Sequence, residues 1–183
     1  MTEHGERARD PDEAAREESR LVVDAAIVRM ARTTGTPVHE RPVSPGASST
    51  FRYADPAAGM RYARILADAA RHAEHQYIKH GREDGMTWHQ IGEALNLTHR
   101  AEERGAPLAE VAFEYAAGAE HALPWETLTF CWRCQSCGQH VGDRGPYNGH
   151  PADNEHGHTD GCQRLTAAVA AWEASWAELD EEA

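Results

Sequence analysis

Apolar positions recur at helical spacing along most of the chain, which predicts a mainly α-helical protein. The clearest case is the C-terminal stripe, whose members follow each other at intervals of three and four residues: Leu165, Val169, Trp172, Trp176 and Leu179. Asp10-Pro11 and Asp55-Pro56 each offer an N-cap residue followed by proline at the first helical position. Further helices are expected at 56–80, 87–96 and 107–118, together with one that begins at Pro11. Thr87 is expected to be the N-cap of the helix at 87–96.

The same pattern divides the chain into three regions. Residues 1–50 are expected to form a charged N-terminal helix and a Pro- and Ser-rich linker, because residues 33–50 are rich in proline, glycine, serine and threonine. Residues 51–124 are expected to form a helical domain. Residues 125–183 combine a cysteine-rich region with the terminal helix, and alternating strand patterns are expected only near the cysteines.

The net charge of the chain limits the classes of binding partner that we expect. The 183 residues include 18 basic and 30 acidic side chains, a net charge of −12. Residues 105–183 carry 3 basic and 13 acidic side chains, a net charge of −10. Such a surface disfavours a phosphate backbone and favours a protein partner with a basic surface. No apolar run approaches the roughly 20 residues that cross a bilayer, and the charged N-terminus lacks a secretory signal pattern, so a cytoplasmic protein without membrane contact is expected.

The four cysteines predict a metal site. In a cytoplasmic protein, clustered cysteines indicate metal ligation rather than disulfides. Cys134 and Cys137 form a Cys-x2-Cys knuckle, and His158 and Cys162 form a His-x3-Cys pair that completes Cys-x2-Cys-x20-His-x3-Cys. Three thiolates and one imidazole saturate a tetrahedral Zn²⁺, so the expected cofactor is Zn²⁺ in a structural role, with no catalytic residue.

Two choices in this ligand set stay open. Cys131 also forms a Cys-x2-Cys pair with Cys134 and is an alternative ligand; otherwise we expect Cys131 to be a buried thiol. His150 and His156 are alternatives to His158. Glu155 would be the general base if the site were open and catalytic, although a solvated loop carboxylate is the interpretation that we prefer.

Residues 130–163 resemble a zinc ribbon, in which Trp132 to Val141 would form the first knuckle and hairpin arm. Ribbons of this kind occur in transcription, replication and translation proteins and as inert scaffolds. The resemblance therefore implies a metal but not a function. The long insert between the two ligand pairs, from Asp143 to Glu155, departs from a plain ribbon.

The segment from Thr87 to Thr98 resembles the first half of the helix-turn-helix in many bacterial regulators with a TWxxIGxAL first helix. Asn96 would take a left-handed turn position. The second helix would turn Glu102 towards the core and end near Gly105, so we interpret the motif as degenerate. Arg100 and Arg104 share one face and are the candidate nucleic-acid contacts, although neighbouring glutamates favour a self-paired face.

As a whole the chain resembles small actinobacterial proteins that pair a degenerate helix-turn-helix-like segment with a zinc-ribbon-like knuckle. The expected fold is a mainly α helical bundle with a C-terminal zinc-stabilised ribbon-like loop and a terminal amphipathic helix. The expected function is that of a non-enzymatic regulator or adaptor acting through protein contacts, within transcription. The alternatives are a sequence-specific DNA-binding regulator using residues 87–104, as a homodimer through the terminal helix, and a zinc-dependent enzyme with an open site.

Overall fold

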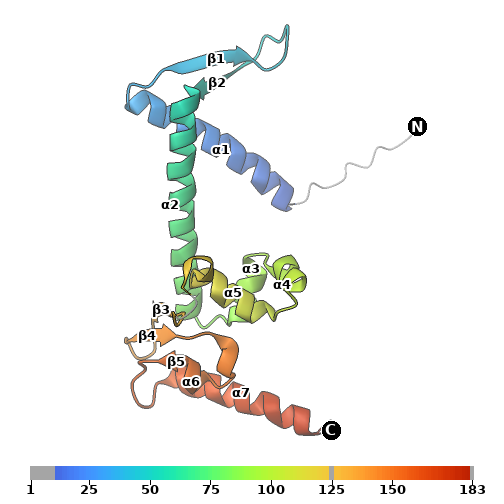
Figure 1. Ribbon diagram of the computed structural model, residues 1–183, viewed down its shortest axis with the longest axis vertical. Helices are drawn as coiled ribbons and strands as arrows, with labels where there is room; N and C mark the ends of the chain where they lie inside the picture. Colours follow the sequence, from blue (N-terminus) through green and yellow to red (C-terminus); the bar gives the residue numbers. More distant parts are fainter. Residues whose placement is uncertain (1–10, 124–125, 182–183) are drawn as a thin grey trace, which may run out of the picture. The chain divides into compact units, whose positions relative to one another are not determined.

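The computed structural model describes residues 11–123 and 126–181. The fold is mainly helical, with two small sheets (Figure 1). Its α-helices are α1 (Pro11–Thr33), α2 (Pro56–Glu83), α3 (Trp88–Ala94), α4 (Thr98–Arg104), α5 (Leu108–Ala116), α6 (Pro151–Asn154) and α7 (Gln163–Glu181). Its strands are β1 (Val38–Pro42), β2 (Thr50–Ala54), β3 (Phe130–Arg133), β4 (His140–Asp143) and β5 (Glu155–His156), and its 3-10 helices are η1 (Ala119–His121) and η2 (Pro146–Asn148).

The described residues fall into two compact units, with the boundary between residues 72 and 73. Helix α2 contributes its first turns to one unit and its last turns to the other. None of the described helices combines the length and hydropathy needed to span a membrane.

The first unit contains a hairpin that the sequence pattern did not predict. Strands β1 and β2 pair antiparallel, with Val38 opposite Ala54 and Pro42 opposite Thr50, so the expectation of a linker is wrong for this stretch. Most side chains of both strands are exposed, and a strand without a buried face has no alternation to detect. The core of this unit is small and consists of Ala31, Ala54, Ala58 and Tyr62.

In the second unit, α3 begins as the sequence predicts. The Thr87 hydroxyl accepts a hydrogen bond from the Gln90 N–H, and the Gln90 side chain accepts one from the Thr87 N–H, a reciprocal capping box. Helix α3 packs against α5 where a Cβ on Gly92 would lie 2.7 Å from the Leu108 side chain. Glycine at this position therefore permits the close approach of the two helices.

The turn after α3 also follows the prediction, because Asn96 has a φ of 55°. Helix α4 is short and ends at Arg104, and its C-cap Gly105 has a φ of 60°. Ala101 is the buried residue of α4, while Glu102 remains exposed, so the helix does not turn a charge into the core. Both helices of the helix-turn-helix-like segment, α3 and α4, are therefore present. Their geometry does not assign them to DNA recognition.

The cysteine region is built on a three-stranded antiparallel sheet in the order β3-β4-β5. Burial alternates along β3 and β4, so that Phe130, Trp132, Val141 and Asp143 point inward. The rings of Phe130 and Phe113 each meet the Trp88 ring at a centroid distance of 5.3 Å. These contacts join the sheet to the helices in one aromatic core.

The sequence predicts that four tryptophans hold the metal region on the helices: Trp125, Trp132, Trp172 and Trp176. Trp132 is fully buried in this core and Trp172 is half-buried on α7. Trp125 and the side chain of Trp176 lie outside the described residues.

Gly145→Ala is expected to lower the free energy of unfolding by about 2–4 kcal/mol, because two costs combine. Gly145 has a φ of 85°, and an added Cβ would lie 2.5 Å from the ring of Phe113, which is fully buried. Gly105→Ala is the matched control, since Gly105 has a φ of 60° and nothing within 4 Å of the added atom. Urea denaturation would measure both variants. Equal losses of unfolding free energy in the two variants would show that the close contact with Phe113 adds no cost.

Candidate metal centre

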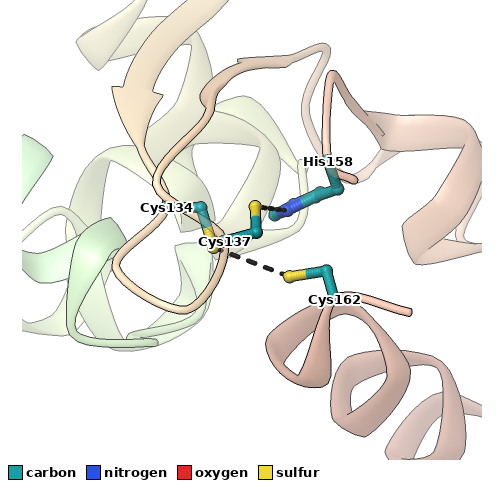
Figure 2. Close-up of side chains that lie close together, drawn as sticks. All are labelled: Cys134, Cys137, His158 and Cys162. Carbon is teal, nitrogen blue, oxygen red and sulfur yellow. Dashed lines mark hydrogen bonds between the residues drawn. The ribbon is translucent and has the colours of Figure 1, made fainter. Parts of the chain in front are cut away.

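The structure brings together the four residues that the spacing predicts. One ligand atom from each of Cys134, Cys137, His158 and Cys162 lies within 4.8 Å of every other (Figure 2). The sulfur atoms of Cys134 and Cys162 are 3.7 Å apart, and the Cys137 sulfur is 3.5 Å from Nδ1 of His158. A cluster this tight could hold one metal ion.

The first ligand pair is positioned by the turn between β3 and β4. The Gly138 N–H donates to the Cys134 carbonyl at 2.7 Å, and the Cys134 N–H donates to the Gln139 carbonyl at 2.9 Å. Gly138 has a φ of 72°, a left-handed conformation that glycine adopts without a steric cost. This tight turn places Cys137 beside Cys134, as a Cys-x2-Cys knuckle requires.

The second ligand pair lies between β5 and α7. The Cys162 N–H donates to the Thr159 carbonyl at 3.1 Å, and the Cys162 carbonyl accepts from the Thr166 N–H at 2.9 Å in the first turn of α7. Cys162 is therefore fixed by the start of the terminal helix. The cluster connects this helix to the β3–β4 turn.

The local electrostatics differ between the two thiols of the knuckle. Backbone N–H groups of Thr159 and Gln139 lower the pKa of the Cys137 thiol to about 5. Burial raises the pKa of Cys134. Metal ligation requires thiolates, and of the two knuckle thiols Cys137 is ionised more readily than Cys134.

Glu155 anchors the histidine of the cluster. One Glu155 carboxylate oxygen lies 3.0 Å from Nε2 of His158, so the ring presents Nδ1 to Cys137 and Nε2 to the carboxylate. Burial opposes protonation of His158, but its hydrogen bonds with Cys137 and Glu155 raise its pKa above the ordinary value. A carboxylate behind a histidine fixes the orientation of the ring and is common at metal centres.

The interpretation of Glu155 as a solvated loop carboxylate is wrong. Glu155 is only 8% exposed, because it opens β5 and pairs with two arginines. Arg82 Nη2 donates to it at 2.5 Å, and Arg164 Nη1 donates at 2.7 Å. The carboxylate is thus ion-paired inside the protein rather than solvated.

Arg82 and Asp143 are buried charged residues that the sequence did not reveal. Arg82 Nη2 donates to Asp143 at 2.8 Å, and Arg82 Nη1 donates to the Met86 carbonyl at 2.5 Å. The Trp88 indole N–H also donates to Asp143, at 3.0 Å. The alternation of side chains along β4 could have predicted that Asp143 points inward. No nearby residue in the sequence predicted that Arg82 would be its partner.

Glu155→Gln is expected to weaken metal binding about 10–100-fold, since it removes the charge that orients His158. Competition with a chromophoric chelator would measure the affinity. Asp153→Asn is the matched control, because Asp153 lies two residues away and is exposed. An unchanged affinity for Glu155→Gln would contradict a role for this carboxylate in holding the histidine.

The alternative ligands lie elsewhere. Cys131 is exposed, so the expectation of a buried thiol is wrong; on β3 it alternates with the inward Phe130 and Trp132. His150 caps α6, where its Nδ1 accepts from the Ala152 N–H at 3.2 Å. His156 is exposed on β5. Among the described residues, none of these three belongs to the cluster.

The candidate nucleic-acid contacts are already paired. Arg100 forms an ion pair with Glu120, and Arg104 Nη2 lies 2.6 Å from Glu114. The two arginines of α4 are therefore paired, Arg100 with a carboxylate of η1 and Arg104 with a carboxylate of α5. The structure gives them no geometry directed at a phosphate.

Comparisons of the chain with protein-family models, with curated proteins and with solved structures gave no match. Any assignment of function therefore rests on the chemistry of the site.

Proposed function

We propose that Cys134, Cys137, His158 and Cys162 hold one structural Zn²⁺ ion. The observation that carries this proposal is the close approach of the four ligand atoms, within 4.8 Å of one another. Three thiolates and an imidazole form a soft donor set that suits Zn²⁺ rather than Mg²⁺ or Ca²⁺.

The distances within the cluster support a tetrahedral ion. Zn–S bonds of about 2.3 Å and Zn–N bonds of about 2.0 Å place tetrahedral sulfurs about 3.8 Å apart and sulfur about 3.5 Å from nitrogen. The corresponding distances are 3.7 Å from Cys134 to Cys162 and 3.5 Å from Cys137 to His158. No ligand would have to move far to bind the ion.

A zinc ion with four protein ligands has no open position for water or substrate, so a stabilising role follows. We infer that the protein is a non-enzymatic regulator or adaptor that acts through protein contacts. The net charge of −10 on residues 105–183 favours a partner with a basic surface. Transcription is a setting in which such zinc modules occur, and it remains part of the proposal.

Metal analysis of the purified full-length protein tests the structural zinc. The expected result is one zinc per chain, with X-ray absorption showing three sulfur and one nitrogen neighbours and no water. Substitution with Co²⁺ should give the visible absorption of a tetrahedral thiolate site. A metal-bound water would instead support the open-site enzyme, and protein without a stoichiometric metal would overturn the proposal.

Titration of fluorescent duplex DNA distinguishes protein contacts from DNA binding. We expect no binding even at low salt, because Arg100 and Arg104 are ion-paired and the C-terminal third is acidic. Binding that weakens steeply with added salt would favour the DNA-binding regulator instead.

A further inference from the structure

An open groove of 580 Å³ lies in the first unit, between one face of α1 and the side chains of β2. Its apolar wall consists of Leu21, Ala25, Val28, Phe51 and Tyr53. Leu21 is 67% exposed and Phe51 is 46% exposed, although both are large apolar side chains. Apolar side chains that gather in an exposed groove, with charged residues beside them, mark a surface that another molecule covers.

The first unit has only a small core to stabilise it. The buried residues of that core are three alanines and one tyrosine: Ala31, Ala54, Ala58 and Tyr62. A two-stranded hairpin is marginal in water, and a unit of fewer than about 70–80 residues seldom has a sufficient core without a disulfide, a metal or association with another chain. The four cysteines and the metal centre belong to the second unit. Covering the groove would therefore add the apolar burial that the first unit lacks.

The groove face of α1 continues toward the N-terminus of the helix as a regular stripe. Intervals of three and four residues place the following side chains on one face: Ala14, Glu17, Leu21, Ala25, Val28 and Arg32. Residues 13–24 include four acidic and two basic side chains, a net charge of −2. Residues 25–33 include two basic side chains and no acidic one, a net charge of +2. The helix thus has an acidic half and a basic half, with apolar residues between them.

The basic side chains of α1 are available to a partner. Arg29 and Arg32 line the groove, and neither forms an ion pair with another described residue. Arg52 also lines the groove, but it is paired with Glu40 at 2.5 Å. An occupant that carries carboxylates beside an apolar stripe would match this arrangement, because complementary charges favour association.

The acidic half of α1 has this character itself, so a second copy of the chain supplies a matching occupant. If two α1 helices lie antiparallel with Leu21 opposite Ala25 of the second copy, Glu18 lies about one residue from the level of Arg29 of that copy. Glu18 and Arg29 also lie on the same side of the stripe. Two-fold symmetry would form each such contact twice.

We propose that the groove is the interface of a homodimer in which the α1 helices of two copies pair antiparallel. The acidic half of each α1 would lie in the groove of the other copy, against Phe51 and Tyr53, and Glu18 would pair with Arg29 across the interface. Such a two-fold interface closes on itself and adds no further copy. It does not involve the terminal helix α7 and does not rest on the proposed zinc site. The dimer would present two copies of the second unit to a partner.

Sedimentation equilibrium of the full chain with its metal retained, from about 1 to 100 μM, tests the dimer. The expected mass is twice the chain mass of 20.2 kDa. Leu21→Glu should raise the dissociation constant of the dimer at least about tenfold, because it places a carboxylate in the apolar part of the interface. Ser19→Glu is the matched control, since Ser19 is exposed and lies on the opposite side of α1.

Charge reversal separates a lost contact from a lost fold. Glu18→Arg and Arg29→Glu should each raise the dissociation constant about tenfold, because each brings like charges together twice in the dimer. The double variant that carries both substitutions should associate within about threefold of the parent, since the pair is restored with its charges exchanged. A monomer at every concentration, a dimer that Leu21→Glu leaves unchanged, or a double variant as weak as the single ones would overturn the proposal.

Discussion

Cys162→Ser is expected to abolish stoichiometric zinc binding and to unfold the segment from β3 to the start of α7. The thiolate of Cys162 connects the terminal helix to the knuckle, and its sulfur lies 3.7 Å from that of Cys134. In small zinc domains the ion contributes an apparent 10–16 kcal/mol or so, comparable to the whole stability of a typical domain. Zinc content, near-ultraviolet circular dichroism and amide exchange in β3 and β4 would measure the loss.

Cys131→Ser provides the matched control for this experiment. Cys131 lies on the exposed side of β3, outside the cluster, so its replacement should leave zinc content and stability within about 0.5 kcal/mol of the parent. A Cys162→Ser protein that retains one zinc and a folded sheet would show that the metal is not what holds this region.

Arg82→Met is expected to destabilise the second unit by about 3–5 kcal/mol. Arg82 is 5% exposed and serves both Asp143 and Glu155, so its removal leaves two carboxylates with a lost partner in a buried setting. Its guanidinium also lies 4.9 Å from the Trp88 ring centroid, a contact that methionine cannot reproduce electrostatically. Urea denaturation followed by tryptophan fluorescence would measure the change.

Arg104→Met separates the effect of burial from that of losing any ion pair. Arg104 pairs with Glu114 on the surface, where its side chain is 42% exposed, and such pairs contribute at most about 1 kcal/mol. If Arg82→Met and Arg104→Met lose similar free energies of unfolding, the burial of Arg82 adds nothing to the cost of losing an ion pair. A similar midpoint for Arg82→Met and the parent protein would lead to the same conclusion.

The features that the sequence predicted correctly are encoded within short segments. The Thr87 cap and the left-handed Asn96 depend on neighbours within a few residues, and the terminal helix follows from a regular apolar stripe. The spacing of Cys134, Cys137, His158 and Cys162 led to the cluster that the structure assembles. The cap, the turn, the apolar stripe and each ligand pair can be recognised in the sequence because the interactions behind them join residues only a few positions apart.

The features that were missed depend on distant partners. Arg82 and Asp143 are 61 residues apart, and no neighbour of either residue in the sequence marks the other as its partner. General experience predicts a solvated Glu155 because exposure is the usual state of a glutamate, yet two arginines pair with it in the interior. Cys131 was misplaced for a simpler reason, since the face of a strand depends on its register, which one residue reverses.

The 3.7 Å separation of the Cys134 and Cys162 sulfurs also bears on how the protein must be handled. If a chelator strips the proposed ion, two neighbouring thiols remain, and dissolved oxygen or peroxide would couple them into a disulfide. That bond would consume two of the four ligands, so the oxidised protein could not be reloaded with metal until a reductant restored the thiols. Reconstitution experiments therefore need a reducing, oxygen-free buffer.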